Sequence, residues 1–324
     1  MLRMQGFGYR HAGDWDEALR LWQDNPGAVY VAGGTDLLPN VKHGLLAPKV
    51  LVGLSGIPGG VVERDGDLVI GATSRLDVLA ADPVVRRLVL PLAEAAASVA
   101  GPQLRTMATL GGNVMLDTRC MFYNQTEFWR RSLGYCLKAE GTWCHVVGGP
   151  KTCVATQSSD TVPVLLALDA RLRFRGPSGT RELALRDLYR FNGMDHLAVE
   201  KGELLTEIVV PLPGDGFRGS YTKLRTRDSI DFPQLGLAVC GTWEGATPTA
   251  LEIVVGAVSP QPKPVRGLDA FLGRTLDAAA IDAVADLVHK QTRPQGSVHG
   301  DTAWRRQMAA VFTRRALGAL AHAG

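Results

Sequence analysis

The chain has 324 residues, of which 46% are hydrophobic and 21% are charged, as is usual for a globular protein with room for two or three domains. The net charge of +3 indicates neither a nucleic acid nor a membrane surface as a partner. No apolar run approaches the about 18 residues of a membrane span, and the first residues lack the apolar core of a secretory signal. We therefore expect a cytoplasmic protein with reduced cysteines.

The first hundred residues alternate short predicted helices and strands. The spacing of Trp15, Leu19 and Trp22 predicts a packing helix over 13–24. The segments that follow predict strands at 28–31 and 49–54, a hairpin at 61–72 with its turn at Asp65-Gly66, and mostly helix over 74–100.

Two glycine pairs follow apolar elements, and both predict turns. Gly33-Gly34-Thr35-Asp36 comes directly after the strand at 28–31, and successive amides in such a turn form an anion nest. The second pair lies in the segment TLGGNV at 109–114. The two turns could clamp the two ends of one diphosphate, or they could be unrelated β-turns. The first is not the GxGxxG fingerprint, so a Rossmann fold is not predicted.

Four of the five cysteines lie within 34 residues, at Cys120, Cys136, Cys144 and Cys153. The same stretch holds six of the 21 aromatic residues. It lies between the second glycine turn and an apolar run at 160–170 that predicts a helix. A long segment of this kind between two ordinary elements indicates an inserted functional loop.

The spacing of these cysteines leaves four alternatives open. Disulfides are disfavoured by an odd cysteine count and the absence of a secretory signal. Structural zinc is disfavoured because the gaps of 15, 7 and 8 residues contain no tight CxxC pair. Buried free thiols are disfavoured by the clustering. An iron–sulfur cubane accepts wide ligand spacing and is favoured by aromatic neighbours that exclude water.

From Arg171 onward the pattern of the sequence changes. Residues 171–175 alternate as an exposed strand does, and 198–212 predict a turn and a strand before Pro213-Gly214. The later segments predict an antiparallel sheet containing Cys240 as a core residue, and then two helices at about 275–290 and 301–321. On the last helix, we expect an apolar side that includes Trp304 and a solvated basic side formed by Arg305, Arg306, Arg314 and Arg315.

An ordered series of short motifs carries a family resemblance over nearly the whole chain. These motifs are YVAGGTDL at 30–37, RT at 105–106, ATLGGN at 108–113, Asp160 at a helix start, YTK at 221–223 and DFP at 231–233. The series resembles the flavin subunits of the molybdenum hydroxylase (xanthine dehydrogenase) family. The segments DTRC, FYNQ, GYCLK and CHV around the cysteines are similar to the β subunits of its 4-hydroxybenzoyl-CoA reductase branch, in which four cysteines bind a [4Fe-4S] cluster.

The resemblance implies an α+β fold with a two-part FAD-binding domain of the vanillyl-alcohol-oxidase type. The expected divisions are 1–212 for this domain, with subdomains at about 1–55 and 56–212 and a cluster loop at about 117–157, and 213–324 for a C-terminal domain of antiparallel sheet and helices.

The resemblance also implies site residues. Those expected at FAD are Val31, Ala32, Gly33, Gly34, Thr35, Asp36, Leu37, Leu38, Gly101, Thr109, Gly112, Asn113, Asp160 and Lys223. The expected cluster ligands are Cys120, Cys136, Cys144 and Cys153, and His145 is expected to be structural. No catalytic acid–base pair, nucleophile triad or molybdenum-binding signature is found, so we expect electron transfer and no substrate chemistry in this chain.

The partners implied are a large molybdopterin-binding subunit, a small [2Fe-2S] subunit and ferredoxin as electron donor, in a dimer of heterotrimers. Electrons would pass through [4Fe-4S] and FAD toward molybdenum and drive dehydroxylation of 4-hydroxybenzoyl-CoA to benzoyl-CoA, a step in aromatic compound degradation. The alternative is the FAD subunit of an oxidative molybdenum hydroxylase acting on another substrate. A zinc-stabilised binding module without redox function is the third hypothesis.

Overall fold

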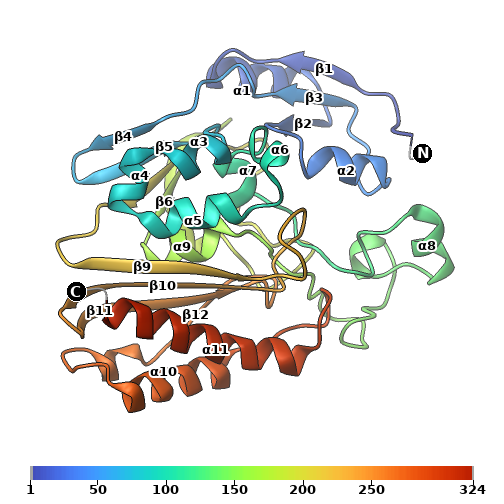
Figure 1. Cartoon of the computed structure of the whole chain (residues 1–324). Helices are drawn as coiled ribbons and strands as arrows, with labels where there is room; N and C mark the ends of the chain where they lie inside the picture. The colour runs from blue at the N-terminus through green and yellow to red at the C-terminus, as the bar shows by residue number, and fades with distance from the viewer. Residues whose placement is uncertain (1–2, 323–324) are drawn as a thin grey trace.

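The computed structural model describes residues 3–322 and contains three sheets in successive layers (Figure 1). The first sheet is parallel, in the order β1 (Gly8–His11), β3 (Val50–Gly53), β2 (Ala28–Val31). Helix α1 (Trp15–Asp24) connects β1 to β2 and begins at Asp14, whose carboxylate accepts a hydrogen bond from the Glu17 amide at 2.7 Å. The predicted helix and strands of this part are confirmed.

The second sheet is antiparallel and has five strands in the order β4-β5-β8-β6-β7. The predicted hairpin is confirmed, since Asp65 and Gly66 both have positive φ angles, 55° and 80°. The strand predicted as exposed is flanked on both sides by β8 and β7, and Leu172 and Phe174 are buried. The bounds are β4 (Val61–Arg64), β5 (Asp67–Gly71), β6 (Arg171–Gly176), β7 (Gly179–Ala184) and β8 (Leu204–Pro211).

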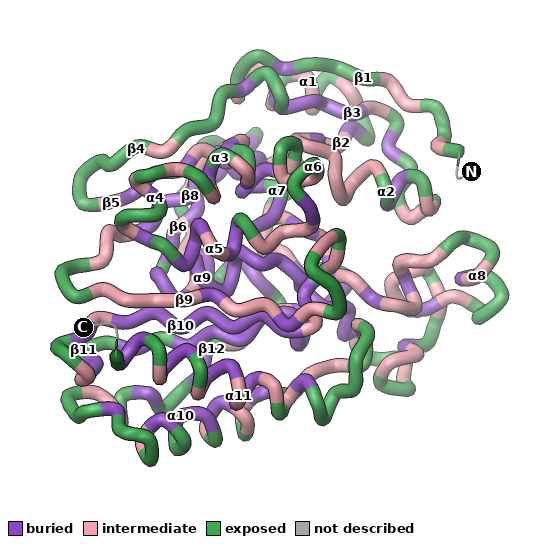
Figure 2. Tube along the Cα trace, in the orientation of Figure 1, coloured by how far each residue is buried: buried purple, intermediate pink, exposed green. Residues whose placement is uncertain are grey.

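The third sheet is also antiparallel, in the order β12-β11-β10-β9, and lies between two layers of helices. Ala238, Cys240 and Val254 face the core beneath the second sheet, whereas the alternate residues of β10 and β11 face α10 and α11. Figure 2 shows β10 buried along most of its length. The bounds are β9 (Phe217–Leu224), β10 (Leu235–Glu244), β11 (Thr247–Gly256), β12 (Lys263–Pro264), α10 (Ala278–Gln291) and α11 (Thr302–Ala321).

Helices α5 and α9 fill the space between the second and third sheets. The helical segment predicted at 74–100 is confirmed as three short helices, broken before Pro83 and Pro91. The bounds are α3 (Leu76–Ala81), α4 (Pro83–Leu88), α5 (Leu90–Ser98) and α9 (Thr161–Ala167). The division expected at 212/213 falls in the loop between β8 and β9.

The prediction that the last helix, α11, packs Trp304 and exposes Arg305 is wrong. Arg305 is fully buried, and its guanidinium donates to the carbonyl oxygens of Gln234, Gln295 and Ala257 at 2.7, 2.8 and 2.6 Å. Trp304, expected on the packed side, is 42% exposed. Arg305 lies one and two turns before the buried Ala309 and Phe312, so it belongs to the packed face, and the carbonyl groups at the end of the sheet satisfy its charge.

Residues 117–157, here called the cysteine segment, leave the sheets and form the projection that carries α8 (Glu127–Ser132) in Figure 1. Its two ends pair through the amides and carbonyls of Arg119 and Thr156, at 2.8 and 2.7 Å. The Met121 amide donates to the Ser297 carbonyl at 2.7 Å, so the base of the segment is also tied to the C-terminal part of the chain. Among residues 3–322, no helix is both long and apolar enough to cross a membrane.

Candidate functional site

The loop between β2 and α2 (Leu37–Lys42) presents a row of backbone amides. Within the part of the chain that the structure describes, the amides of Gly33, Gly34, Thr35 and Asp36 donate no hydrogen bond. Gly34 has a φ of 69°, which turns successive N–H groups toward one side. This arrangement is an anion nest, suited to a phosphate oxygen.

Gly33 joins this loop to the second glycine segment. A Cβ at Gly33 would lie 1.8 Å from the carbonyl oxygen of Met107, so only glycine permits the close approach. The second segment begins two residues after Met107. The loop at Gly33 and the segment that begins at Thr109 are therefore neighbours in space, although 76 positions separate them in the sequence.

The second glycine segment is a short helix, α7 (Leu110–Val114), and not the turn that was predicted. Thr109 is its N-cap and accepts from the Gly112 amide at 3.1 Å. The Leu110 and Gly111 amides donate to the carbonyls of Ser74 and Ala72, at 2.9 and 2.8 Å. Because these amides have protein partners, the open anion nest belongs to the first segment alone.

A cavity of about 250 Å³ lies between the two glycine segments and the start of β8. Residues from both segments line it, together with apolar side chains of α1, β2 and β8. Of the residues expected at FAD, the structure brings Ala32, Thr109 and Gly112 together on the wall of this cavity.

Asp160 and Lys223 form a buried pair at the start of α9. The carboxylate of Asp160 accepts from the Tyr221 hydroxyl at 2.8 Å and from Lys223 Nζ at 3.1 Å. Nζ also donates to the carbonyls of Ser98 and Asp231, at 3.0 and 2.9 Å, so each of its three protons has a protein acceptor. Burial raises the pKa of Asp160 to about 6, although Lys223 and Tyr221 lower it.

Gly101 and Asn113 also have internal partners. Gly101 packs against the side chains of Ser229 and Ile230, in the loop after β9. The side-chain oxygen of buried Asn113 accepts from the Ser159 and Thr161 hydroxyls at 2.6 and 2.8 Å. Contact of these residues, or of Asp160 and Lys223, with a flavin stays a prediction.

Arg119, one residue before the first clustered cysteine, contacts the first glycine loop. Its Nη1 donates to Asp36 Oδ1 at 2.7 Å, and its guanidinium lies 3.8 Å from the centre of the Phe232 ring. Asp36 Oδ2 in turn accepts from Asn40 at 3.0 Å. The sequence analysis did not predict a role for Arg119. Its position next to Cys120, and the presence of an acidic residue, Asp36, in the first glycine loop, were the only signals for this ion pair.

The cysteine segment buries its four thiols in one place. Cys120, Cys136, Cys144 and Cys153 are all free and between 5% and 8% exposed. Burial, together with a smaller contribution from the other three thiolates, raises the pKa of Cys120 to about 12. The backbone amides of Phe122 and Ala155 lower the pKa of Cys120 and of Cys153, against the effect of burial. The structure therefore contains no disulfide among its described cysteines and places the four sulfurs within electrostatic reach of one another.

The described residues include no group of three or more His, Cys, Asp or Glu arranged to hold a single metal ion. A cubane has a different requirement, since its four thiolates surround a body much larger than one ion. Gly193 leaves room beside one sulfur: a Cβ there would lie 2.8 Å from Cys153 Sγ. Binding of a cluster by these cysteines stays a prediction.

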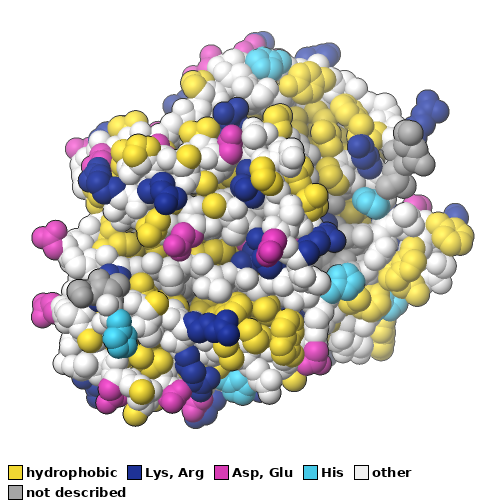
Figure 3. All heavy atoms as spheres, in the orientation of Figure 1, with side chains coloured by type: hydrophobic (Ala, Val, Ile, Leu, Met, Phe, Trp, Pro, Cys, Tyr) yellow, Lys and Arg dark blue, Asp and Glu magenta, His cyan; other side chains and the backbone are white. Residues whose placement is uncertain are grey.

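The aromatic residues of the segment divide into two groups. Tyr123 is buried, and Phe122 packs with His145, whose Nε2 lies 2.7 Å from the Tyr135 carbonyl oxygen. Phe128 and Trp143 are 74% and 49% exposed, and Figure 3 shows hydrophobic side chains on the surface near α8. Aromatic shielding of the thiols thus comes from the inner group only. His145 contacts a carbonyl group, consistent with the structural role expected for it.

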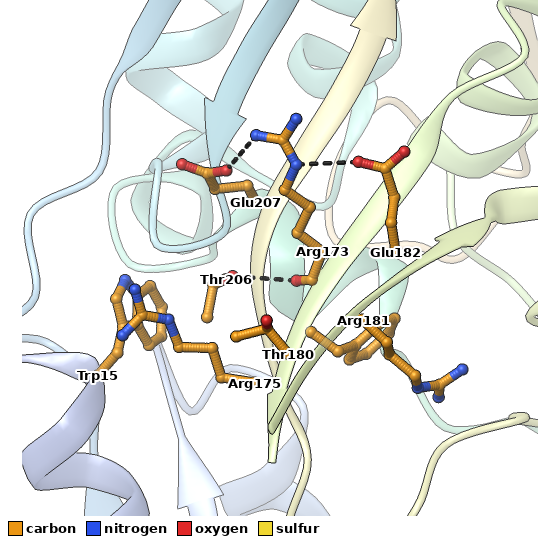
Figure 4. A pocket seen from close by; sticks show the side chains of 9 residues that line it. Trp15, Arg173, Arg175, Thr180, Arg181, Glu182, Thr206 and Glu207 are labelled. Atoms are coloured by element: carbon orange, nitrogen blue, oxygen red, sulfur yellow. Dashed lines mark hydrogen bonds and ion pairs between the residues drawn. The ribbon is translucent and has the colours of Figure 1, made fainter. Parts of the chain in front are cut away.

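A second cavity, of about 440 Å³, also has Trp15 in its lining (Figure 4). It is lined by three arginines, but each has a carboxylate partner: Arg173 contacts Glu182 and Glu207, Arg175 contacts Asp16, and Arg181 contacts Glu203. These pairs leave little free positive charge for an anion.

Comparisons with known proteins agree with this geometry. Residues 5–213 match the model of the FAD binding domain in molybdopterin dehydrogenase, and residues 220–320 match the CO dehydrogenase flavoprotein C-terminal domain. The chain is 34% identical, over 85% of its length and 88% of the relative's, to the aldehyde oxidoreductase FAD-binding subunit PaoB of Escherichia coli.

Two further similarities concern CO dehydrogenases. The chain is 30% identical to the carbon monoxide dehydrogenase medium chain of Afipia carboxidovorans, over 89% of this chain and 86% of that one. Its fold is similar to that in a structure of reconstituted CO dehydrogenase from Oligotropha carboxidovorans, with a TM-score of 0.81, 27% identity, and coverage of 99% and 100%.

Proposed function

Because the chain belongs to the family of FAD-binding subunits of molybdenum hydroxylases, we propose that it is an electron-transfer subunit carrying both FAD and a [4Fe-4S] cluster. The expected α+β architecture with an FAD-binding domain agrees with the family match. The proposal that the chain binds a cluster has a different support, which is that the cysteine segment contains four free, buried thiols.

The anion nest supports the position of FAD. The free amides of Gly33, Gly34, Thr35 and Asp36 would receive the diphosphate, and Thr109 and Gly112 would line the adjoining cavity. The neighbouring Val31, Ala32, Leu37 and Leu38 would complete this wall. Asp160 and Lys223 would act by holding α9 and the loop after β9 in place, since their polar atoms already have protein partners.

The four thiols fit a cubane by chemistry and burial. Cys120, Cys136, Cys144 and Cys153 would supply the thiolates, and the amides of Phe122 and Ala155 would donate to two of the sulfurs. Tyr123 would exclude water from the site. A flavin exchanges electrons singly or in pairs and a cubane one at a time. This chain would fix the two groups relative to each other through the Asp36–Arg119 contact.

The proposed partners are a large molybdopterin-binding subunit and a small [2Fe-2S] subunit. The support is the family match together with the names of the relatives, which are subunits or chains of multi-subunit dehydrogenases. The sequence shows neither a catalytic acid–base pair nor a nucleophile triad, and we propose that the substrate binds in the large subunit. A dimer of heterotrimers remains part of the proposal.

Two directions of electron flow fit this subunit. The motifs around the cysteines support reductive removal of the 4-hydroxyl group of 4-hydroxybenzoyl-CoA, with ferredoxin as donor. The 34% identity to an aldehyde oxidoreductase subunit favours the second candidate, an oxidative molybdenum hydroxylase whose electrons leave through this chain.

The first experiment is the iron, acid-labile sulfide and flavin content of the anaerobically purified chain. The proposal expects about four irons, four sulfides and one FAD per chain. Cys144→Ser should lower iron and leave flavin unchanged. Flavin without iron in the wild-type chain would contradict the cluster.

The second experiment separates the two directions in the intact complex. A ferredoxin or viologen donor should support dehydroxylation of 4-hydroxybenzoyl-CoA if flow is reductive. If flow is oxidative, aldehydes should reduce the flavin anaerobically, and the viologen assay should give no benzoyl-CoA.

A further inference from the structure

Lys138 is a buried cation at the base of the cysteine segment. It lies two residues after Cys136, on the short 3-10 helix Leu137–Ala139, and its side chain is 7% exposed. Nζ donates to Asp117 Oδ1 at 2.6 Å and to the carbonyl and hydroxyl oxygens of Thr118 at 3.0 and 2.6 Å. All three protons have acceptors, so the ammonium is held in one position.

The ammonium lies against the group of residues that buries the thiols. Nζ is 4.8 Å from the centre of the Tyr123 ring, and Tyr123 packs with Cys120, Cys136 and Cys153. Lys138 is also separated from Cys136 by a single residue of the chain. The ring of Tyr123 thus has the ammonium on it and packs with three of the four cysteines.

The negative charge beside Lys138 is more exposed than the lysine itself. The Asp117 side chain is 36% exposed, so water screens its charge more than it screens the ammonium. His196 Nδ1 lies 3.9 Å from Asp117 Oδ1, and burial lowers the pKa of this imidazole, which disfavours a second positive charge beside Asp117. Of the two charges in this pair, the positive one is therefore the less screened by water.

We propose that Lys138 is a positioning residue that raises the reduction potential of the cluster held by the four cysteines; this inference rests on the cluster of the proposed function. Reduction adds one electron and makes the site one charge more negative, with no bond broken and no proton required. A fixed positive charge in a poorly solvated place favours that added charge.

The test is a potentiometric titration of the intact complex, followed by the spectroscopic signal of the reduced cubane. Lys138→Met should reduce the equilibrium constant for reduction about tenfold, which is about 59 mV toward more negative potential for a one-electron couple. Lys151→Met is the matched control, because Lys151 lies two residues before Cys153 and is exposed. Lys138→Arg should keep the potential near that of the wild type.

A second variant provides a test of the proposal even if Lys138→Met fails to bind the iron–sulfur cluster. Asp117→Asn removes the opposing charge and should move the potential in the positive direction. If Lys138→Met loses its iron, a positive shift in Asp117→Asn supports the proposal, and an unchanged or negative value overturns it.

The outcomes also separate this inference from the function it rests on. A wild-type complex without four irons assigned to this chain would overturn both. A wild-type cluster whose potential is the same in Lys138→Met and Lys151→Met would overturn the inference about Lys138 and leave the cluster itself in place.

Discussion

Asp36 and Arg119 connect the two sites of this chain: Oδ1 of the acid and Nη1 of the base lie 2.7 Å apart. Asp36 ends the anion nest and Arg119 precedes the first clustered cysteine. Both side chains are between 22% and 23% exposed, so water screens the pair less than it screens a surface salt bridge. The contact gives the cysteine segment a defined position relative to the glycine loop.

Breaking this contact should weaken flavin binding. Arg119→Met leaves Asp36 with Asn40 as its remaining side-chain donor, and the loop at residues 33–36 loses its contact with the cysteine segment. We expect FAD affinity to fall about tenfold, equivalent to about 1.4 kcal/mol. The affinity is measured by titrating the apoprotein with FAD and following the flavin fluorescence. Arg87→Met is the control, since it breaks the more exposed 2.8 Å pair with Glu63; an equal loss in both variants would contradict the role of Arg119.

Gly33→Ala should remove FAD from the purified chain. The new Cβ would meet the Met107 carbonyl oxygen at 1.8 Å, so the loop must move away from the second glycine segment. We expect at least an about tenfold weaker FAD affinity from this strain. Gly60→Ala is the control, because nothing lies within 4 Å of a Cβ there. Wild-type flavin content in Gly33→Ala would show that the loop adapts freely.

Gly193→Ala should disturb the thiol site without touching a cysteine. A Cβ would lie 2.8 Å from Cys153 Sγ and 2.7 Å from the Ala155 amide. We expect iron content to fall to less than about half, with flavin retained, because the sulfur and the backbone of Ala155 are both displaced. Gly149→Ala, also in the cysteine segment but with open space around its Cβ, should keep its iron. Iron analysis of both variants checks the prediction, and equal iron in the two would refute it.

Arg305→Met should destabilise the C-terminal part of the chain. The substitution leaves three carbonyl groups that accept from the buried guanidinium without a donor. We expect the free energy of unfolding to fall by about 3 kcal/mol. Arg315→Met, at an exposed position of the same helix, should change it by less than about 0.5 kcal/mol. Urea denaturation measures both, and similar midpoints for the two variants would show that Arg305 is dispensable.

Asp160 should make stability depend on pH. Its pKa of about 6 in the folded chain lies above the about 3.9 of an unfolded one, so the folded state holds this proton more tightly. The resulting stabilisation is fully present below about pH 3.9 and is lost as the pH rises through about 6. Between about pH 4 and pH 7, the unfolding free energy of the wild type minus that of Asp160→Asn should fall by up to about 3 kcal/mol. Denaturant titrations across this range check the sign, and a difference that rises with pH would refute it.

Local patterns were enough to predict most elements. The helix at 13–24, the Asp65-Gly66 hairpin and the two C-terminal helices were found because periodicity and turn chemistry act between residues that are close in sequence. The glycine loop after β2 was also predicted, since only glycine accepts the backbone conformation of Gly34 without strain.

Long-range contacts decided what those patterns could not. Arg305 was expected on the surface because an arginine within an amphipathic helix carries no local sign of the three distant carbonyl groups that accept its protons. In the same way, spacing left four explanations for the cysteines open, and the structure removed the disulfides, because it buries four free thiols, three of them in one cluster with Tyr123. Partners far apart in sequence meet only when the sheets pack, so burial, charge pairing and the position of Lys138 follow from the tertiary structure.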